Sequence, residues 1–343
     1  MIGAGCRLLL GAGMLLTTAS AAAMLQADSA AAPAADHTPP PSPAEQTAQP
    51  LQGQLISTGS VTMAELMYAF AQTLSERHPG ISMQVHAAGS ATAPPALIEG
   101  TANIGAMSRP MRADELQRFR QRHGHDLTMR MVAHDAIVMI VNLRNPLPDI
   151  SLTQIAQLFS ASMACPHMLA QPLLQSWSEI LPPQTQAGAF GRRSIQRYSR
   201  NSASGTYSWF RENALCGAAM APAVHRMLSH AAIVNAVQQS DNGIGYIGYA
   251  HSGFGTRTLP IRTGPEAGQR ILADAANITD GSYPLSRQLY LYLNLPPDDA
   301  MSSAVVALLR LIYSPTGEQI ILRAGLLPLS AAQQRQQLQG IIE

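Results

Sequence analysis

Apolar residues along this chain recur with two different periods, and the two periods alternate. Residues 54–56 and 81–86 have the short or alternating apolar pattern of strands. Between them, a helix is predicted to open at Thr62, because the apolar positions that follow fall on one helical face: Leu66, Met67, Phe70 and Leu74.

The same alternation continues to the end of the chain. Further strands are predicted at residues 104–107, 131–142, 243–249, 256–261 and 289–294. Further helices are predicted at residues 94–99, 151–159, 205–215, 231–239, 299–313 and 315–323. Strands that alternate with helices favour an α/β fold, in which helices cover the faces of a sheet.

The composition is that of a folded protein with little net charge. Hydrophobic residues make up 46% of the chain and charged residues 13%, and the formal net charge is +1. Such a chain has no bulk field that would attract nucleic acid or an anionic membrane. All 22 basic residues are arginine, so any basic ligand contact comes from a guanidinium, which binds oxyanions in a planar, often bidentate way.

The N-terminal residues have the pattern of a secretory signal. Arg7 precedes an apolar run at residues 8–18 that is too short to span a bilayer, and small residues that suit cleavage follow it. We therefore expect residues 1–23 to be a signal peptide and the mature protein to lie in the periplasm. Residues 24–50 are rich in Ala and Pro and are predicted to form a disordered tether, with folded structure from about Leu51.

Cysteine usage fits an oxidising compartment. Cys6 lies before the apolar run and is expected to leave with the signal peptide, so the mature chain keeps Cys165 and Cys216. An isolated pair in an oxidising compartment favours a disulfide. The alternative is two buried thiols.

Three turns of small polar residues each come just before a predicted helix, at residues 59–62, 89–92 and 204–206. Free backbone N–H groups and hydroxyls at a helix N-terminus favour an anion, and glycine lets a ligand approach the backbone closely. Arg109 and Arg200 lie near such turns in the sequence. For any one turn the alternative is an ordinary N-cap, because Ser and Thr are preferred there.

Two stretches are specific enough to indicate a family. They are Arg-x-x-x-Ser-Gly-Thr at residues 200–206 and Ala-Asn-Ile-Gly-Ala-Met-Ser-Arg at residues 102–109. Together with STGSVTMAELM, NGIGYIGY and YPLSRQLYLYLN, they make residues 51–329 resemble the periplasmic phosphate-binding proteins that feed ABC importers. The resemblance implies a two-lobed type II periplasmic binding protein fold, in which each lobe is a mixed sheet flanked by helices and two hinge strands join the lobes.

The resemblance also implies a domain division and a function. Lobe 1 is expected to comprise residues 51–137 and 249–330, lobe 2 residues 138–248, and the C-terminal tail residues 331–343. The protein is expected to be a monomeric receptor that closes on inorganic phosphate and delivers it to an ABC permease, without cofactor, metal or nucleic acid. Ten residues are implied to bind the anion: Ser60, Val61, Thr62, Ser90, Ser108, Arg109, Arg200, Ser204, Gly205 and Thr206.

The chain departs from the family pattern at places that bear on selectivity. Its third loop carries Ser108 and Arg109 where well-known relatives have an aspartate that accepts the proton of bound phosphate. Ser202 stands where relatives keep a carboxylate beside the arginine, and Val61 stands where many carry a hydroxyl or carboxylate. Asp135 is then the nearest candidate proton acceptor. The alternative is that Asp135 is a strand-end or hinge residue bonded to backbone.

Other chemistry is not indicated by the sequence. The serines of SASG lack the Gly-x-Ser-x-Gly pattern of an esterase, so no enzyme is predicted. The histidines show no metal-ligand spacing, and His123 and His125 lie in an arginine-rich stretch typical of a solvated helix face. Two alternatives to a phosphate receptor remain. One is a receptor for sulfate, molybdate or a phosphonate, and the other is a secreted or sensory interaction protein that reuses the fold.

Overall fold

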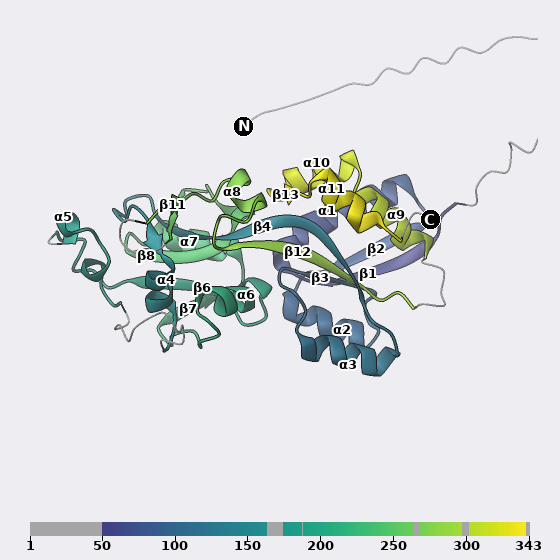
Figure 1. Ribbon diagram of the computed structural model, residues 1–343, viewed down its shortest axis with the longest axis horizontal. Coiled ribbons are helices and arrows are strands. Elements are labelled where there is room, and N and C mark those ends of the chain that lie inside the picture. The colour runs from purple at the N-terminus through teal and green to yellow at the C-terminus, as the bar shows by residue number, and fades with distance from the viewer. Residues whose placement is uncertain (1–49, 163–173, 187, 264–267, 297–301, 341–343) are drawn as a thin grey trace, which may run out of the picture. The chain divides into compact units, whose positions relative to one another are not determined.

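The computed structural model describes residues 50–162, 174–186, 188–263, 268–296 and 302–340 (Figure 1). The chain divides into residues 1–48 and residues 49–343, and every described residue belongs to the second unit. The predicted signal peptide and, apart from Pro50, the predicted tether therefore lie outside the described residues.

The strands form a large sheet of ten and a small sheet of three. The order of the large sheet is β2-β1-β3-β12-β4-β8-β6-β7, and β9 and β13 each pair with β4. The small sheet has the order β11-β10-β5. The strands are β1 Gly53–Gly59, β2 Ile81–His86, β3 Ile104–Met107, β4 Thr128–Asn142, β5 Ile150–Ser151, β6 Gln196–Arg200, β7 Val224–Met227, β8 Gly243–Gly248, β9 Thr256–Leu259, β10 Ile261–Arg262, β11 Arg270–Ile271, β12 Ser286–Leu293 and β13 Leu327–Pro328.

Helices alternate with these strands, so the fold is mixed α/β as the sequence predicts. The α-helices are α1 Ala64–Arg77, α2 Ala93–Ile98, α3 Ala113–His123, α4 Leu152–Phe159, α5 Pro183–Gln186, α6 Gly205–Ala214, α7 His230–Gln239, α8 Ala275–Thr279, α9 Ser303–Ile312, α10 Pro315–Arg323 and α11 Ala331–Leu338. Short 3-10 helices are η2 Val61–Met63, η3 Ser90–Thr92, η4 Trp177–Glu179 and η5 Tyr249–His251.

Strand β4 connects two hydrophobic cores. It is 15 residues long and is buried without interruption from Val132 to Asn142, which explains why this stretch is apolar apart from His134, Asp135 and Asn142. Figure 1 shows β4 and β12 side by side, and β12 pairs antiparallel with residues 128–136 of β4. The first core contains Val132 with residues of α1, α9, β1 and β12. The second core contains Ile137 with residues of α4, α6, α7 and β8.

Local patterns in the sequence predicted many of these elements correctly. The predicted strands 81–86 and 104–107 coincide with β2 and β3, and α1 buries the four predicted apolar residues. The predicted strand 256–261 is divided into β9 and β10 at Pro260, because proline has no N–H to donate to a sheet. The predicted C-terminal tail, residues 331–343, contains helix α11.

Among the described residues, no single helix has the length and hydropathy needed to cross a membrane. Helices α9 and α10 meet at a bend of 68°. Taken together, and by length and composition only, they could form a bent membrane-spanning pair.

Candidate functional site

Each predicted turn places a small polar residue at the start of a helix. Ser60 is the N-cap of η2, which leads into α1, and Ser204 caps α6 by accepting a hydrogen bond from Thr206 N. Gly59, before Ser60, has a φ of +144°, and a Cβ there would lie 2.0 Å from the Ala106 carbonyl oxygen. Glycine is therefore required for the first turn to pass this close to β3.

The second and third turns contact each other directly. Ser90 of the second turn contacts Ser108, which directly follows β3. Ser108 N donates to Ser90 Oγ at 3.1 Å, and the two hydroxyl oxygens are 3.2 Å apart. A Cβ on Gly205 would lie 2.2 Å from Ser90 Oγ and 2.6 Å from Ser108 Oγ. Ala91 N also donates to Ala203 O at 3.1 Å. The loops that precede α2 and α6 thus meet backbone to backbone, and only a residue without a side chain fits at position 205.

The hydroxyls of Thr62 and Thr206 lie at the centre of a buried polar cluster, which also includes His230 and Arg287. Thr62 Oγ1 and Thr206 Oγ1 are 3.2 Å apart, although 144 residues separate them in the sequence. Thr62 Oγ1 also lies 3.1 Å from His230 Nε2, and Arg287 Nη1 donates to Thr206 Oγ1 at 3.1 Å. Helix starts beside the two hydrophobic cores therefore contribute to one buried group of hydroxyls.

Arg200, at the end of β6, is 1% exposed and is linked to Thr62 through the ring of His230. Its Nη2 donates to Leu228 O at 2.9 Å, its Nη1 lies 2.8 Å from His230 Nε2, and its Nε has no hydrogen-bond partner. Burial lowers the pKa of Arg200 to about 10; Tyr246 opposes this shift and the positive charge of Arg287 adds to it. The guanidinium is thus protonated at neutral pH.

The structure also shows the environment of the predicted departures from the family pattern. Ser202 is exposed and Val61 is half-buried. None of the described ion pairs joins a carboxylate to Arg200, whose partners are instead the Leu228 carbonyl and the ring of His230. The charge of Arg200 is therefore not neutralised by a carboxylate in the described part of the chain.

Arg287, which the sequence analysis did not identify, links the cluster to Asp135. Arg287 donates to Asp135 Oδ2 from Nε at 2.9 Å and from Nη2 at 2.6 Å, and both side chains are 0% exposed. Its Nη1 donates to Ser108 O at 3.2 Å. Asp135 Oδ1 accepts from Tyr249 N at 3.2 Å. Asp135 therefore lies next to the site with both carboxylate oxygens engaged by other groups.

His230, also missed by the sequence analysis, is the first residue of α7 and is 1% exposed. Its Nδ1 accepts from Gly248 N at 3.2 Å, and its ring stacks on that of His251 with centroids 4.5 Å apart. Burial lowers the pKa of His230 well below 6.5, and the charges of Arg200 and Arg287 lower it further. The ring is therefore neutral at neutral pH.

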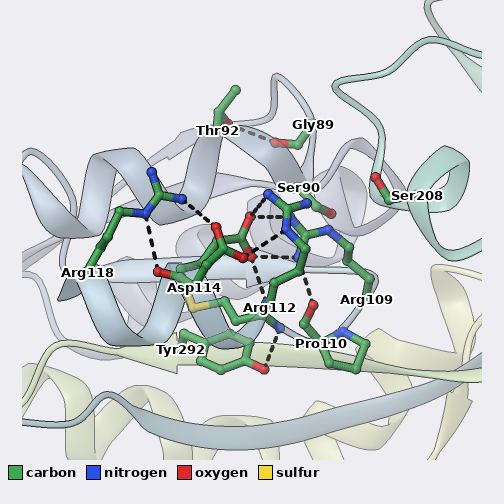
Figure 2. Close-up of polar contacts among 12 residues, drawn as sticks. Gly89, Ser90, Thr92, Arg109, Pro110, Arg112, Asp114, Arg118, Ser208 and Tyr292 are labelled. Atoms are coloured by element: carbon green, nitrogen blue, oxygen red, sulfur yellow. Dashed lines mark hydrogen bonds and ion pairs between the residues drawn. The ribbon is translucent and has the colours of Figure 1, made fainter. Parts of the chain in front are cut away.

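Arg109 does not join this group of side chains. Its Nη1 and Nη2 donate to Glu115 at 2.8 and 2.7 Å, and Nη1 also donates to Pro110 O at 2.7 Å. Figure 2 shows Arg109 beside Ser90 and Pro110, at the edge of the network that holds the start of α3. Burial acts to raise the pKa of Glu115, but hydrogen bonds and charge from Arg109 and Arg112 outweigh it and lower that pKa.

Two buried donors among these residues are unpaired. Ser60 Oγ and Arg200 Nε are buried and lack a hydrogen-bond partner, as do several buried atoms elsewhere in the described residues. Buried polar groups are normally satisfied, so an unpaired donor next to a helix start or a buried guanidinium is available to a ligand with acceptor atoms. Two guanidinium groups and one carboxylate, from Arg200, Arg287 and Asp135, leave an excess of one positive charge. The arrangement is suited to a small oxyanion.

Metal binding has no comparable support in the described residues, where no group of three or more His, Cys, Asp and Glu side chains could hold an ion. Cys165 lies outside the described residues, so its predicted disulfide with Cys216 stays a prediction.

Comparisons with known proteins show the family of this chain. Residues 44–316 match the family model described as the PBP superfamily domain. The chain is 38% identical over 296 residues to the phosphate-binding protein PstS of Pseudomonas aeruginosa. The matched region covers 85% of this chain and 88% of that relative.

Two solved structures share the fold. A putative phosphate ABC transporter substrate-binding protein with bound phosphate from Clostridium perfringens has a TM-score of 0.65 and 21% identity, covering 81% of this chain and 100% of that one. An ABC-type phosphate transport receptor from Vibrio cholerae has a TM-score of 0.61 and 18% identity, covering 80% of this chain and 100% of that one.

Proposed function

This chain belongs to the PBP superfamily and, within it, to the family of phosphate-binding proteins of phosphate ABC importers, and we propose that it is a periplasmic receptor for inorganic phosphate. In this proposal it closes two lobes on the anion and delivers it to an ABC permease in the inner membrane. It acts as a monomer, without a cofactor or metal, and carries out no reaction of its own.

The observation that carries the proposal is the convergence of buried donors at Thr62 and Thr206. Their hydroxyls, the partly unpaired guanidinium of Arg200 and the unpaired hydroxyl of Ser60 are all supplied by residues at a strand end or a helix start. An oxyanion accepts hydrogen bonds from every one of these groups at once. Phosphate would thus replace the direct contacts between donors with contacts to its oxygens.

Closure would depend on the contact between the second and third turns. Ser90 and Ser108 lie against Gly205 with no space for a side chain between them, and Ala91 N donates to Ala203 O. These contacts would be lost if the loops that precede α2 and α6 moved apart. In this proposal they stabilise the ligand-bound arrangement, as in other receptors that close around a ligand.

We propose the two lobes largely as the sequence predicts, with lobe 1 at residues 51–137 and 249–330 and lobe 2 at residues 138–248. One boundary is refined: Leu259, Ile278 and Leu285 pack in the second core. Residues 256–263 and 268–285 are therefore better assigned to lobe 2.

The secretion signal and the disulfide are part of the same proposal. A signal peptide at residues 1–23 would place the receptor in the periplasm, where a pairing of Cys165 with Cys216 would persist.

A second oxyanion remains a candidate ligand because of Asp135. Its carboxylate accepts from Arg287 and from Tyr249 N, so less of its acceptor capacity is left for the proton of monohydrogen phosphate. A site made mainly of donors discriminates less against sulfate, which carries no proton at neutral pH.

The species that the protein carries when purified tests the proposal. Protein secreted by its native host would be purified in buffers free of phosphate and sulfate, then denatured and assayed for released phosphate and sulfate. Phosphate at about one equivalent supports the proposal. Sulfate in its place supports the second candidate, and neither anion contradicts both.

A further inference from the structure

The imidazole of His230 has a defined tautomer. Its Nδ1 accepts a hydrogen bond from Gly248 N at 3.2 Å, and a backbone N–H has no lone pair to offer in return. A neutral imidazole has one N–H and one acceptor nitrogen. Because Nδ1 is the acceptor, the proton of neutral His230 lies on Nε2.

This tautomer directs two donors at each other. His230 Nε2 lies 2.8 Å from Arg200 Nη1, and every guanidinium nitrogen is a donor only. Thr62 Oγ1, 3.1 Å from Nε2, can accept a hydrogen bond from the imidazole N–H, but Arg200 Nη1 beside it still faces a donor instead of an acceptor. A donor facing a donor at this distance is stabilised only when an acceptor atom enters between them or beside them.

We propose that His230 is a ligand-binding residue, whose Nε2–H donates to the same oxyanion that Arg200 holds. The inference rests on the proposed function, because it assumes that the acceptor is a small oxyanion. It adds a neutral donor from α7 to a site for which the sequence predicted only hydroxyls, backbone amides and arginine. One ligand oxygen then resolves the opposed contact between His230 and Arg200.

The groups around His230 keep its ring neutral. Arg200 faces it from β6, Arg287 from β12 and His251 from η5, while Thr62 and Gly248 contact its two nitrogens. No carboxylate bonds to the His230 ring in the described part of the chain; Asp135 is engaged by Arg287. A second proton on His230 would add charge beside two guanidinium groups and displace the Gly248 bond.

A neutral Nε2–H donor has a consequence for ligand choice. It bonds to a deprotonated oxygen and cannot accept a proton from the ligand. Like the engaged Asp135, it therefore favours the oxygens that monohydrogen phosphate and sulfate share. A preference for phosphate would then come from groups that can accept its proton, among them the hydroxyls of Thr62 and Thr206, which both donate and accept.

The tautomer and the contact are tested in one NMR experiment on uniformly ¹⁵N-labelled protein. Long-range proton–nitrogen correlations of the imidazole, assigned by their loss in His230→Gln, report which nitrogen carries the proton. We expect an Nε2–H tautomer without ligand and a shifted Nε2 resonance with inorganic phosphate or sulfate. An Nδ1–H tautomer, or an unmoved Nε2 resonance while the Thr206 amide responds to the anion, overturns the inference.

Paired variants give a second, independent test. Both His230→Gln and His230→Leu lose the acceptor for Gly248 N, but only Gln keeps a donor near the position of Nε2. We expect His230→Leu to bind the anion roughly 10- to 100-fold more weakly than wild type, with His230→Gln between them. Equal affinities in the two variants overturn the inference.

The matched control is His225→Leu, which changes an exposed histidine of β7 and should leave affinity unchanged. Circular dichroism shows whether each variant is folded. If His230→Leu is not folded, the NMR experiment alone tests the inference. Absence of phosphate and sulfate binding in wild type overturns the proposed function together with this inference. If the anion binds but the Nε2 resonance of His230 does not move, the inference is overturned and the proposed function is not.

Discussion

Arg287 donates two hydrogen bonds to one oxygen of Asp135, and neither side chain is exposed to solvent. The pair joins the neighbouring strands β12 and β4 where β4 passes from the first core to the second. The remaining guanidinium nitrogen, Nη1, reaches Ser108 O and Thr206 Oγ1. One buried ion pair thus holds the strands that connect the two cores and orients a hydroxyl of the site.

Asp135→Asn should lower the free energy of unfolding by about 3–5 kcal/mol, because it leaves the charge of Arg287 buried without a counter-ion. Urea unfolding of ligand-free protein measures the loss. Asp114→Asn is the matched control: Asp114 pairs with Arg118 at 2.9 Å, and both side chains are largely exposed. A midpoint shift as small as that of the control would show that the buried pair does not hold these strands.

Arg200→Gln should weaken phosphate binding roughly 30- to 1,000-fold, because the anion would lose its charged donor in a buried site. Calorimetric titration measures the change. Arg197→Gln is the control, since Arg197 is a buried arginine on the same strand whose guanidinium donates to the Leu174 carbonyl. Comparable losses of affinity in the two variants would remove Arg200 from the site.

The sequence predicted the elements of the site that are local. Glycine, serine and threonine before a helical pattern identify a helix N-terminus without knowledge of the rest of the fold. Ser60, Thr62, Ser90, Ser204 and Thr206 were found in this way. The structure brings their turns together through the pairing of β1 with β3 and the contact between the second and third turns.

The residues that the sequence analysis missed depend on long-range pairing. Arg287 lies on β12, whose pairing with β4 brings it to Asp135, 152 residues earlier in the chain. A signal was present in both missed cases. Arg287 falls on the buried face that Leu289 and Leu291 share, and His230 falls on the buried face of α7 with Ile233. A polar residue on an apolar face indicates a buried partner.

Arg109 was expected to bind the anion, but the structure pairs it with a nearby carboxylate. It follows Ser108 directly, as the family pattern suggested. Glu115 lies six residues later, at the start of α3, and takes both ends of the guanidinium. Nothing in the spacing alone decides between a ligand and such a capping carboxylate.

Gly205→Ala should weaken phosphate binding roughly 5- to 100-fold, because the added methyl group would meet Ser90 Oγ and Ser108 Oγ well inside contact distance. Alanine suits the first turn of a helix, so the ligand-free protein should keep its thermal midpoint. Calorimetry and a thermal melt separate the two effects. Ser202→Ala, at an exposed position of the same loop, should change neither, and wild-type affinity in Gly205→Ala would argue against closure at this contact.

The ligand-free protein should lose stability as the pH falls below about 6.5. Burial lowers the pKa of both His230 and His251, so the unfolded chain takes up protons before the folded protein does. Stability is then complete above pH 6.5 and falls towards the lower folded-state pKa, by at most about 1.4 kcal/mol per pH unit for each histidine. Urea unfolding between pH 7 and pH 5 measures this slope. His230→Gln should reduce the slope, and an identical slope in that variant would contradict a buried neutral His230.

The most direct test of the central claim is calorimetric titration of inorganic phosphate into protein that has been unfolded, dialysed free of ligand and refolded. The account predicts saturable binding of one phosphate per chain, retained without added metal ions. A parallel titration in excess sulfate measures how strictly the site selects phosphate while Asp135 is paired with Arg287. No heat of binding with phosphate, in protein whose circular dichroism shows that it has refolded, would contradict the claim that these donors form a phosphate site.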